Sequence, residues 1–199
     1  MAITRARTSS VAQGPTTRKT ISGGNDVILP GGYDAIGDVV VGSGGATSVS
    51  FSSISSAYTH LELRWIYRMK DYSAEGSQAY LYFNGVRNGQ YSLHILYATG
   101  AVAGASASTS LSETYIRVGT GPTALTNNFG AGVTSILDYK NTNKNKTILT
   151  LGGYDNNGSG SINLTSGLIP VTAALSSFVI TPQDGNFAQY SQFSLYGIK

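Results

Sequence analysis

The 199-residue sequence contains no cysteine. This excludes disulfide bonds, thiolate metal sites and a cysteine nucleophile. Long hydrophobic runs are also missing, because no stretch approaches the ~18 apolar residues that a membrane-spanning helix needs. The N-terminus, MAITRARTSSVAQG, has no apolar core of signal-peptide length. We therefore expect no membrane insertion and no export through a signal peptide, so that a role outside the cell would require release within an assembled particle.

Charged residues are scarce, at 12% of the chain, and the net charge is +3. The whole basic excess lies in residues 1–30, where four basic residues face Asp26 alone, so the rest of the chain is formally neutral. Tight binding to nucleic acid depends on neutralising several phosphates at once. We therefore expect no nucleic-acid partner.

What the sequence has instead is glycine (25 residues), tyrosine (13 residues) and short alternating segments. The clearest segment is HLELRWIYR, residues 60–68. Its apolar face consists of Leu61, Leu63, Trp65 and Tyr67, and its polar face of Glu62, Arg64 and Arg68. A period of two with one polar face is typical of an antiparallel sheet over a core.

About ten strand candidates of this kind follow Tyr33, separated by turns rich in Gly, Asn, Ser or Pro. Another is AYLYFNG, in which Ala79, Leu81 and Phe83 share one face. The pattern predicts an all-β fold, an antiparallel β-sandwich of jelly-roll type over residues 33–199. Residues 98–110, ATGAVAGASASTS, are predicted to form a long loop, because small polar side chains offer little to bury.

Residues 1–32 are predicted to be an irregular N-terminal arm, since Gly-Pro and Gly-Gly pairs interrupt any regular period. Two interpretations stay open: a disordered tail, or an anchoring arm that becomes ordered against another subunit. The candidate partner-binding residues of the arm are Arg5, Arg7, Arg18, Lys19, Val27, Ile28 and Leu29.

Candidate catalytic chemistry is sparse. His60 and His94 are not at metal-ligand spacing, no Gly-x-Ser-x-Gly motif is present, and the ten carboxylates are scattered. We therefore nominate no catalytic, cofactor-binding or metal-binding residue and expect a protein that is not an enzyme. A glycosidase that pairs two carboxylates across strands stays open as an alternative.

A lysine-rich segment, SILDYKNTNKNKTILTLGGYD, covers residues 135–155. Its lysines, Lys140, Lys144 and Lys146, lie between two strand-like runs, among residues that favour turns. The segment is predicted to be a β-hairpin with the lysines on its turn. A basic contact for a partner and a nucleic-acid contact are the alternatives.

This segment resembles a pattern in small structural proteins of tailed bacteriophages, especially aquatic ones, in which Ile-x-Asp-Tyr leads through an Asn/Thr/Lys turn to a Lys-Thr strand and Gly-x-Asp. The resemblance extends to the segment from Tyr33 to Arg64, to LYFNG and YSLHIL, and to the terminal FSLYGIK. At Val86 this chain departs from the acidic residue of the pattern Phe-Asn-Gly-Asp. The resemblance implies a virion component.

The resulting expectation is a structural protein on the surface of a phage particle, part of a tail fibre or host-contact appendage and anchored by its arm. Its expected partners are further copies of itself, as a homotrimer, other virion proteins and a host surface receptor, since sandwiches poor in charge cover their edges by oligomerising. A capsid decoration (cement) protein is the alternative. A carbohydrate-binding or carbohydrate-active protein is the third interpretation.

Overall fold

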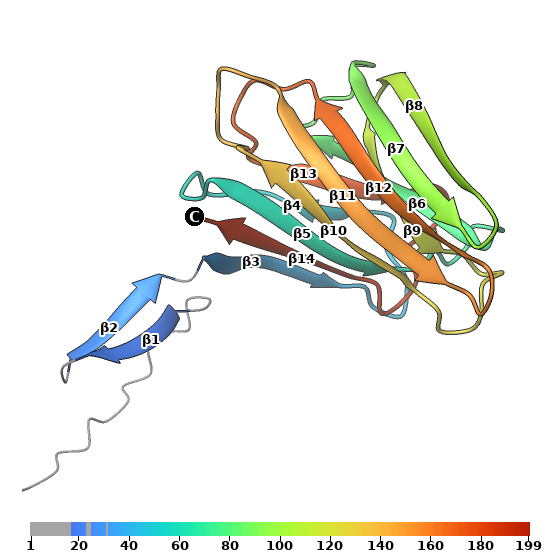
Figure 1. Cartoon of the computed structure of the whole chain (residues 1–199), viewed down its shortest axis with the longest axis horizontal. Helices are drawn as coiled ribbons and strands as arrows, with labels where there is room; N and C mark the ends of the chain where they lie inside the picture. Colours follow the sequence, from blue (N-terminus) through green and yellow to red (C-terminus); the bar gives the residue numbers. More distant parts are fainter. Residues whose placement is uncertain (1–16, 23–24, 31) are drawn as a thin grey trace, which may run out of the picture.

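The computed structural model describes residues 17–22, 25–30 and 32–199, and these residues contain fourteen strands and no helix (Figure 1). No helix that could cross a membrane is therefore present in this part of the chain. The strands form a two-stranded, an eight-stranded and a four-stranded sheet, and all their pairings are antiparallel.

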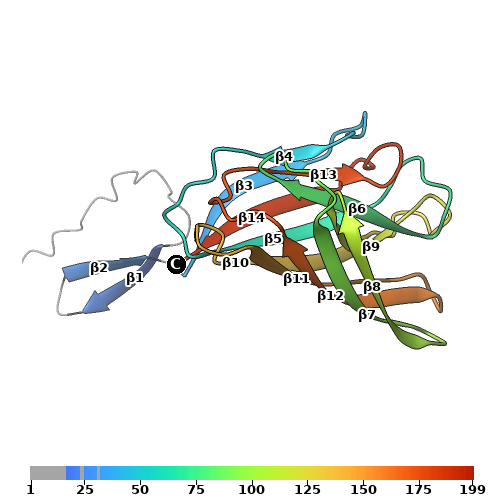
Figure 2. The same ribbon diagram turned by 90° about the horizontal axis from the view of Figure 1, so that it is seen from above.

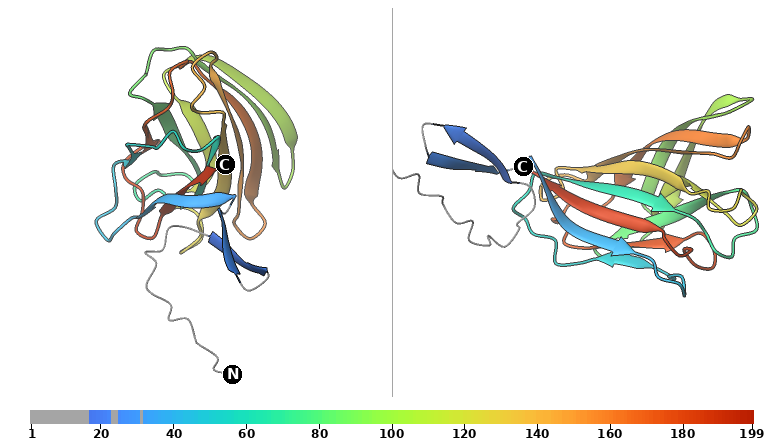
Figure 3. Two further views of the ribbon diagram at one scale, coloured as in Figure 1. Left: turned by 90° about the vertical axis from the view of Figure 1, so that its left-hand side faces the viewer. Right: turned by 90° about the horizontal axis from the view of Figure 1, so that it is seen from below.

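The large sheet has the strand order β3 (Tyr33–Val40), β14 (Gln192–Ile198), β5 (His60–Tyr67), β10 (Gly130–Leu137), β11 (Lys146–Asp155), β12 (Gly160–Ile169), β7 (Tyr91–Thr99) and β8 (Ala103–Leu111). The small sheet has the order β4 (Val49–Phe51), β13 (Phe178–Pro182), β6 (Gly76–Phe83) and β9 (Thr114–Thr120). The two sheets pack face to face (Figure 2), which confirms the predicted β-sandwich. The large sheet is strongly twisted between β3 at one end and the β7–β8 pair at the other (Figure 3).

The core lies between the two sheets and follows the alternation predicted for residues 60–68. Leu61, Leu63, Trp65 and Tyr67 are all buried, whereas Ile66 points outward and is 46% exposed. The small sheet contributes Ala79, Leu81 and Phe83 of β6, also buried as predicted. This apolar burial is the main favourable term for folding.

The position of the Trp65 side chain accounts for the glycines at two positions of the large sheet. Its indole lies beneath Gly132 and Gly152, where an added Cβ would approach the ring to 2.3 Å and 2.5 Å. The indole Nε1 donates a hydrogen bond to Thr134 Oγ1 at 3.2 Å. A side chain at either glycine would therefore displace the tryptophan.

The prediction of a loop over residues 98–110 is wrong. β7 extends to Thr99, and Ala103–Leu111 forms the edge strand β8, which pairs with β7 through registers such as Leu96 with Ala105. Most side chains of β8 are exposed or half-buried. Backbone hydrogen bonds to β7 hold the strand in place. Such bonds cannot be predicted from the hydrophobicity of the side chains.

The predicted hairpin over residues 135–155 is confirmed, because β10 pairs with β11 and the turn lies between them. On the turn, Lys144 forms a 2.7 Å ion pair with Asp138. The placement of Lys146 on the solvated turn is wrong, since this residue begins β11 and is 1% exposed.

The buried ammonium of Lys146 is satisfied by backbone carbonyls. Its Nζ donates to the carbonyl oxygens of Val171 at 3.0 Å, Thr172 at 2.6 Å and Ala173 at 2.8 Å. It also donates to Lys144 O at 3.2 Å and to Asn141 O. Burial lowers the pKa of this lysine. The side chain thus joins the β10–β11 turn to the segment that follows β12.

Within the predicted N-terminal arm, β1 (Thr17–Ser22) and β2 (Asn25–Pro30) form an antiparallel hairpin. Its register opposes Arg18 to Leu29 and Lys19 to Ile28, and places Val27 opposite Thr20. Arg5 and Arg7 lie outside the described residues.

Candidate interaction surface

Over residues 149–151 of β11 and 162–165 of β12 the polarity is inverted relative to the core, whereas Ile148 and Ile169 of the same strands are buried. On β11, Leu149 and Leu151 point outward and are 45% and 53% exposed, while Thr150 between them is buried. On β12, Ile162 and Leu164 are exposed and Asn163 is buried. These strands therefore present aliphatic side chains to the outside of the sandwich.

The sheet register extends this surface over five neighbouring strands. Leu151 lies opposite Val133 of β10 on one side and Leu164 on the other, and Leu164 lies opposite Leu96 of β7. We call the surface the apolar outer face. Its residues are Ile66, Leu96, Ala131, Val133, Leu137, Leu149, Leu151, Ile162, Leu164 and Leu168.

The size of the apolar outer face follows from sheet geometry. Five strands at about 4.8 Å spacing span about 19 Å, and the outward positions from Ile162 to Leu168 span about 20 Å along the strand. The footprint is thus about 400 Å², within the range of the largest apolar patches on soluble monomers, which are often functional.

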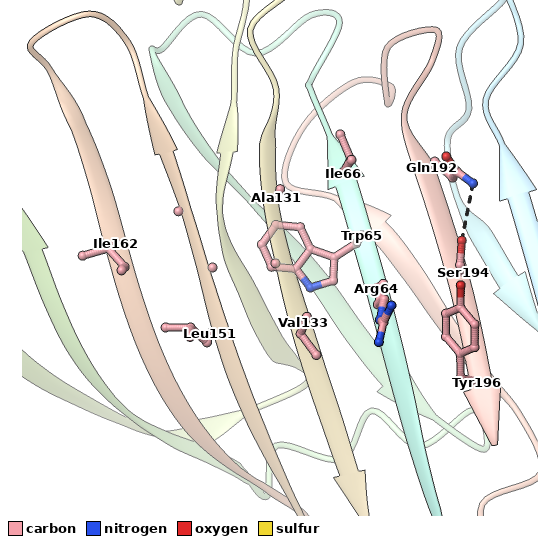
Figure 4. Close-up of a pocket in the computed structure, with 13 residues that line it drawn as sticks. Arg64, Trp65, Ile66, Ala131, Val133, Leu151, Ile162, Gln192, Ser194 and Tyr196 are labelled. Carbon is pink, nitrogen blue, oxygen red and sulfur yellow. Dashed lines mark hydrogen bonds between the residues drawn. The ribbon is translucent and has the colours of Figure 1, made fainter. Parts of the chain in front are cut away.

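A hollow of about 560 Å³ lies within this face (Figure 4). It forms because the outward positions of β10 and β11 in this row are the small residues Ala131 and Gly153, which lie opposite each other. The larger side chains of Ile66 and Ile162 stand on either side of them. A bulky apolar side chain of a partner would fit this depression.

A cluster of charged and aromatic residues borders the face at β3, β5 and β14. Arg64 donates a 2.9 Å hydrogen bond from Nε to Glu62 Oε1, and its guanidinium lies 5.0 Å from the centre of the Tyr196 ring. Tyr33 Oη donates to the same carboxylate at 3.2 Å, and the charge of Glu62 raises the pKa of Tyr33. The face therefore has an apolar centre that is bordered on the β5 side by polar and charged residues.

The chemistry available here is burial of apolar surface. The described residues contain no group of three or more His, Asp or Glu placed to hold a metal ion. His94 is exposed at the edge of a second hollow of about 510 Å³, beside Leu96 and Leu149. Its neighbours there are apolar or small.

None of the residues on this face was nominated from the sequence. Of the predicted partner-binding residues, Arg18 and Lys19 lie on β1 and Val27, Ile28 and Leu29 on β2. The sequence does indicate such a surface, because the segment TILTL, residues 147–151, has aliphatic side chains at both odd-numbered and even-numbered positions of one strand. Adjacent Ile148 and Leu149 must face opposite sides of the sheet, so one of them must be exposed or covered by a partner.

Comparison of the chain with models of protein families, with curated proteins and with solved structures finds no match.

Proposed function

We propose that this chain is a structural component of a tailed-phage virion, assembled as a homotrimer through its apolar outer face and anchored by its N-terminal arm, residues 1–32. In that position it would contact the host surface as part of a tail fibre or similar appendage. The observation that carries the assembly is the inverted polarity of β11 and β12. The virion setting is supported by the resemblance of residues 33–199 to phage structural proteins.

The argument for assembly is energetic. Leu151, Ile162 and Leu164 contribute most when they are removed from water, yet each is at least 40% exposed in the monomer. A neighbouring subunit on this face would supply that burial. The footprint of about 400 Å² is about half of the area that each partner contributes to a standard interface, and the surrounding rim would contribute the remainder.

The partner we propose is a second copy of this chain. A regular, nearly neutral sheet face is complementary in shape to another sheet, and two sheets pack at about 10 Å. The formally neutral body adds no strong repulsion between copies. In a trimer the three faces would surround the threefold axis like the sides of a prism, so that each face packs against part of both neighbours rather than face to face with one copy.

Sedimentation equilibrium tests the assembly. We expect the wild type to sediment with the mass of a trimer and the double variant L151K/L164K to sediment as a folded monomer. The matched control is Ser50→Lys, which adds a charge at an exposed position on β4 of the small sheet. A monomeric wild type, or a double variant that stays assembled, would contradict the proposal.

Quantitative mass spectrometry of purified particles tests the setting. A few tens of copies per particle would support the tail position, whereas hundreds would indicate capsid decoration. Absence of the chain from particles would refute the virion proposal without touching the assembly of the purified protein.

A further inference from the structure

A second concave site lies where the two sheets meet at the β7–β8 end of the large sheet. It is a cleft of about 520 Å³. Its lining comes from β6 and β9 of the small sheet, from β7, β8, β11 and β12 of the large sheet, and from two connecting segments. Unlike the apolar outer face, it is lined mainly by tyrosine, amide, hydroxyl and guanidinium groups. We propose that this cleft binds an acidic saccharide, such as a uronic-acid unit of a glycan.

Three half-buried tyrosines line the cleft: Tyr72, Tyr97 and Tyr154. Two of these tyrosine side chains lie directly against a glycine. The Tyr97 hydroxyl lies 2.6 Å from the place of a Cβ on Gly104, and the Tyr154 hydroxyl lies 2.7 Å from the place of a Cβ on Gly76. Only a residue without a side chain leaves room for these rings to lie against the backbone at positions 76 and 104.

Several polar groups of the lining are not used by the fold. In residues 32–199, the Arg117 guanidinium forms no hydrogen bond or ion pair with another protein group, and neither do the side chains of Tyr97 and Gln183. Asn163 is 8% exposed and donates Nδ2 to Ser161 Oγ at 3.2 Å, which leaves its Oδ1 as an acceptor. Guanidinium, phenol and amide groups thus converge on one cleft.

These groups match the chemistry of a saccharide. A pyranose ring has an apolar C–H face that packs on an aromatic ring and hydroxyls that bond to amides and phenols. The guanidinium adds a planar fork of donors that binds a carboxylate through two parallel hydrogen bonds. Arg117 is the one basic residue of the lining, and the carboxylate of Glu75 lies at Tyr154. The cleft therefore suits a single carboxylate held by Arg117 rather than a run of phosphates.

The same inversion of β12 that exposes Ile162 turns Asn163 toward the interior, where it lines the cleft. The saccharide proposal does not rest on assembly or on a virion setting, because Tyr97 and Arg117 are not part of the apolar outer face. The two proposals can therefore fail separately.

Titration calorimetry of the full-length protein tests the cleft. The probes are disaccharides that contain glucuronate, galacturonate or sialate, each paired with its neutral counterpart of the same linkage. We expect saturable binding of at least one acidic member. Arg117→Gln should weaken that binding at least tenfold and remove the preference over the neutral sugar, and Tyr97→Ala should weaken both.

Arg87→Gln is the matched control, since Arg87 is paired with Glu113 and stacks on Tyr82 outside the cleft. It should bind like the wild type, and circular dichroism should show that all three variants fold. The proposal is overturned if no probe binds saturably, if neutral and acidic sugars bind equally, or if R117Q and Y97A bind like the control. If Tyr97→Ala fails to fold, Tyr97→Phe replaces it; this variant removes only the hydroxyl and should still bind more weakly than the control.

Discussion

Two regions of the same sheet, β5 and residues 149–151 and 162–165 of the β11–β12 pair, have opposite polarity although only β10 separates them. β5 buries Leu63 and Trp65 and exposes Arg64. β12 exposes Leu164 and buries Thr165. Under the proposed assembly, β5 is shaped by the folding of one chain, whereas the exposed aliphatic residues of β11 and β12 would be shaped by contacts between copies.

The inner face of the inverted region supports this distinction. Thr134 and Thr150 share a 2.9 Å hydrogen bond in the interior, but the buried hydroxyl of Thr165 has no hydrogen-bond partner in the described part of the chain. Burying such a hydroxyl costs stability. The inverted strands thus gain less from folding than β5 does, and the proposed contacts between copies would compensate.

The largest effect should come from the core side of the comparison. We expect Trp65→Ala to lower the free energy of unfolding by about 3–5 kcal/mol, because it leaves a cavity beneath Gly132 and Gly152. Ile162→Ala, on the apolar outer face, should cost less than about 1 kcal/mol in the same monomer.

Both variants are measured by urea unfolding in the L151K/L164K background, so that assembly does not contribute to stability. Circular dichroism is the signal, since Trp65 is the single tryptophan. If Trp65→Ala and Ile162→Ala lower the free energy of unfolding equally, the core and the apolar outer face do not differ in their contribution to the stability of the monomer.

An intermediate effect is expected at Lys146, the polar residue that begins β11 on the inner side. Lys146→Met should cost about 2–3 kcal/mol, because it leaves the buried carbonyl of Val171 and the part-buried carbonyls of Thr172 and Ala173 without this donor. Lys144→Met removes only the exposed ion pair with Asp138 and should cost less than about 1 kcal/mol. Thermal unfolding of both variants in the L151K/L164K background gives the difference in stability between them. If Lys146→Met is no less stable than Lys144→Met, the cluster of carbonyls does not need a cation.

The smallest expected effect is a gain in stability rather than a loss. Thr165→Val should stabilise the monomer by about 1 kcal/mol, because it replaces an unpaired buried hydroxyl with a methyl group of similar size. Thr150→Val should instead destabilise it by about 1 kcal/mol, since it removes one of the two side-chain partners of the Thr134 hydroxyl and leaves only Trp65. A loss of stability on Thr165→Val would mean that this hydroxyl is satisfied in solution.

The sequence allowed correct prediction where one chain supplies every contact. The alternation in β5 and the apolar face of β6 identified Trp65, Leu81 and Phe83 as core residues, because hydrophobic side chains there face the interior. The hairpin that contains Lys144 was equally predictable, since turn-forming residues separate two strand-like runs.

The remaining features depend on information that local sequence does not carry. Thr150 and Asn163 are buried and Leu151 is exposed, which reverses the usual rule, so the interaction surface was missed. The sequence predicts a loop at β8 because the pairing of this strand with β7 uses backbone groups. Lys146 was placed on the turn because the carbonyls that bind it come from residues 171–173, about 25 positions along the chain.

Solvent access to position 151 tests the central claim most directly, since the natural chain has no cysteine to interfere. Leu151→Cys and the control Ser50→Cys are each labelled with a maleimide over a dilution series. If the apolar outer face is buried between copies, Cys at position 151 should react at least about tenfold more slowly than Cys at position 50 at high concentration, and the two rates should converge on dilution. Equal rates at every concentration would contradict the account.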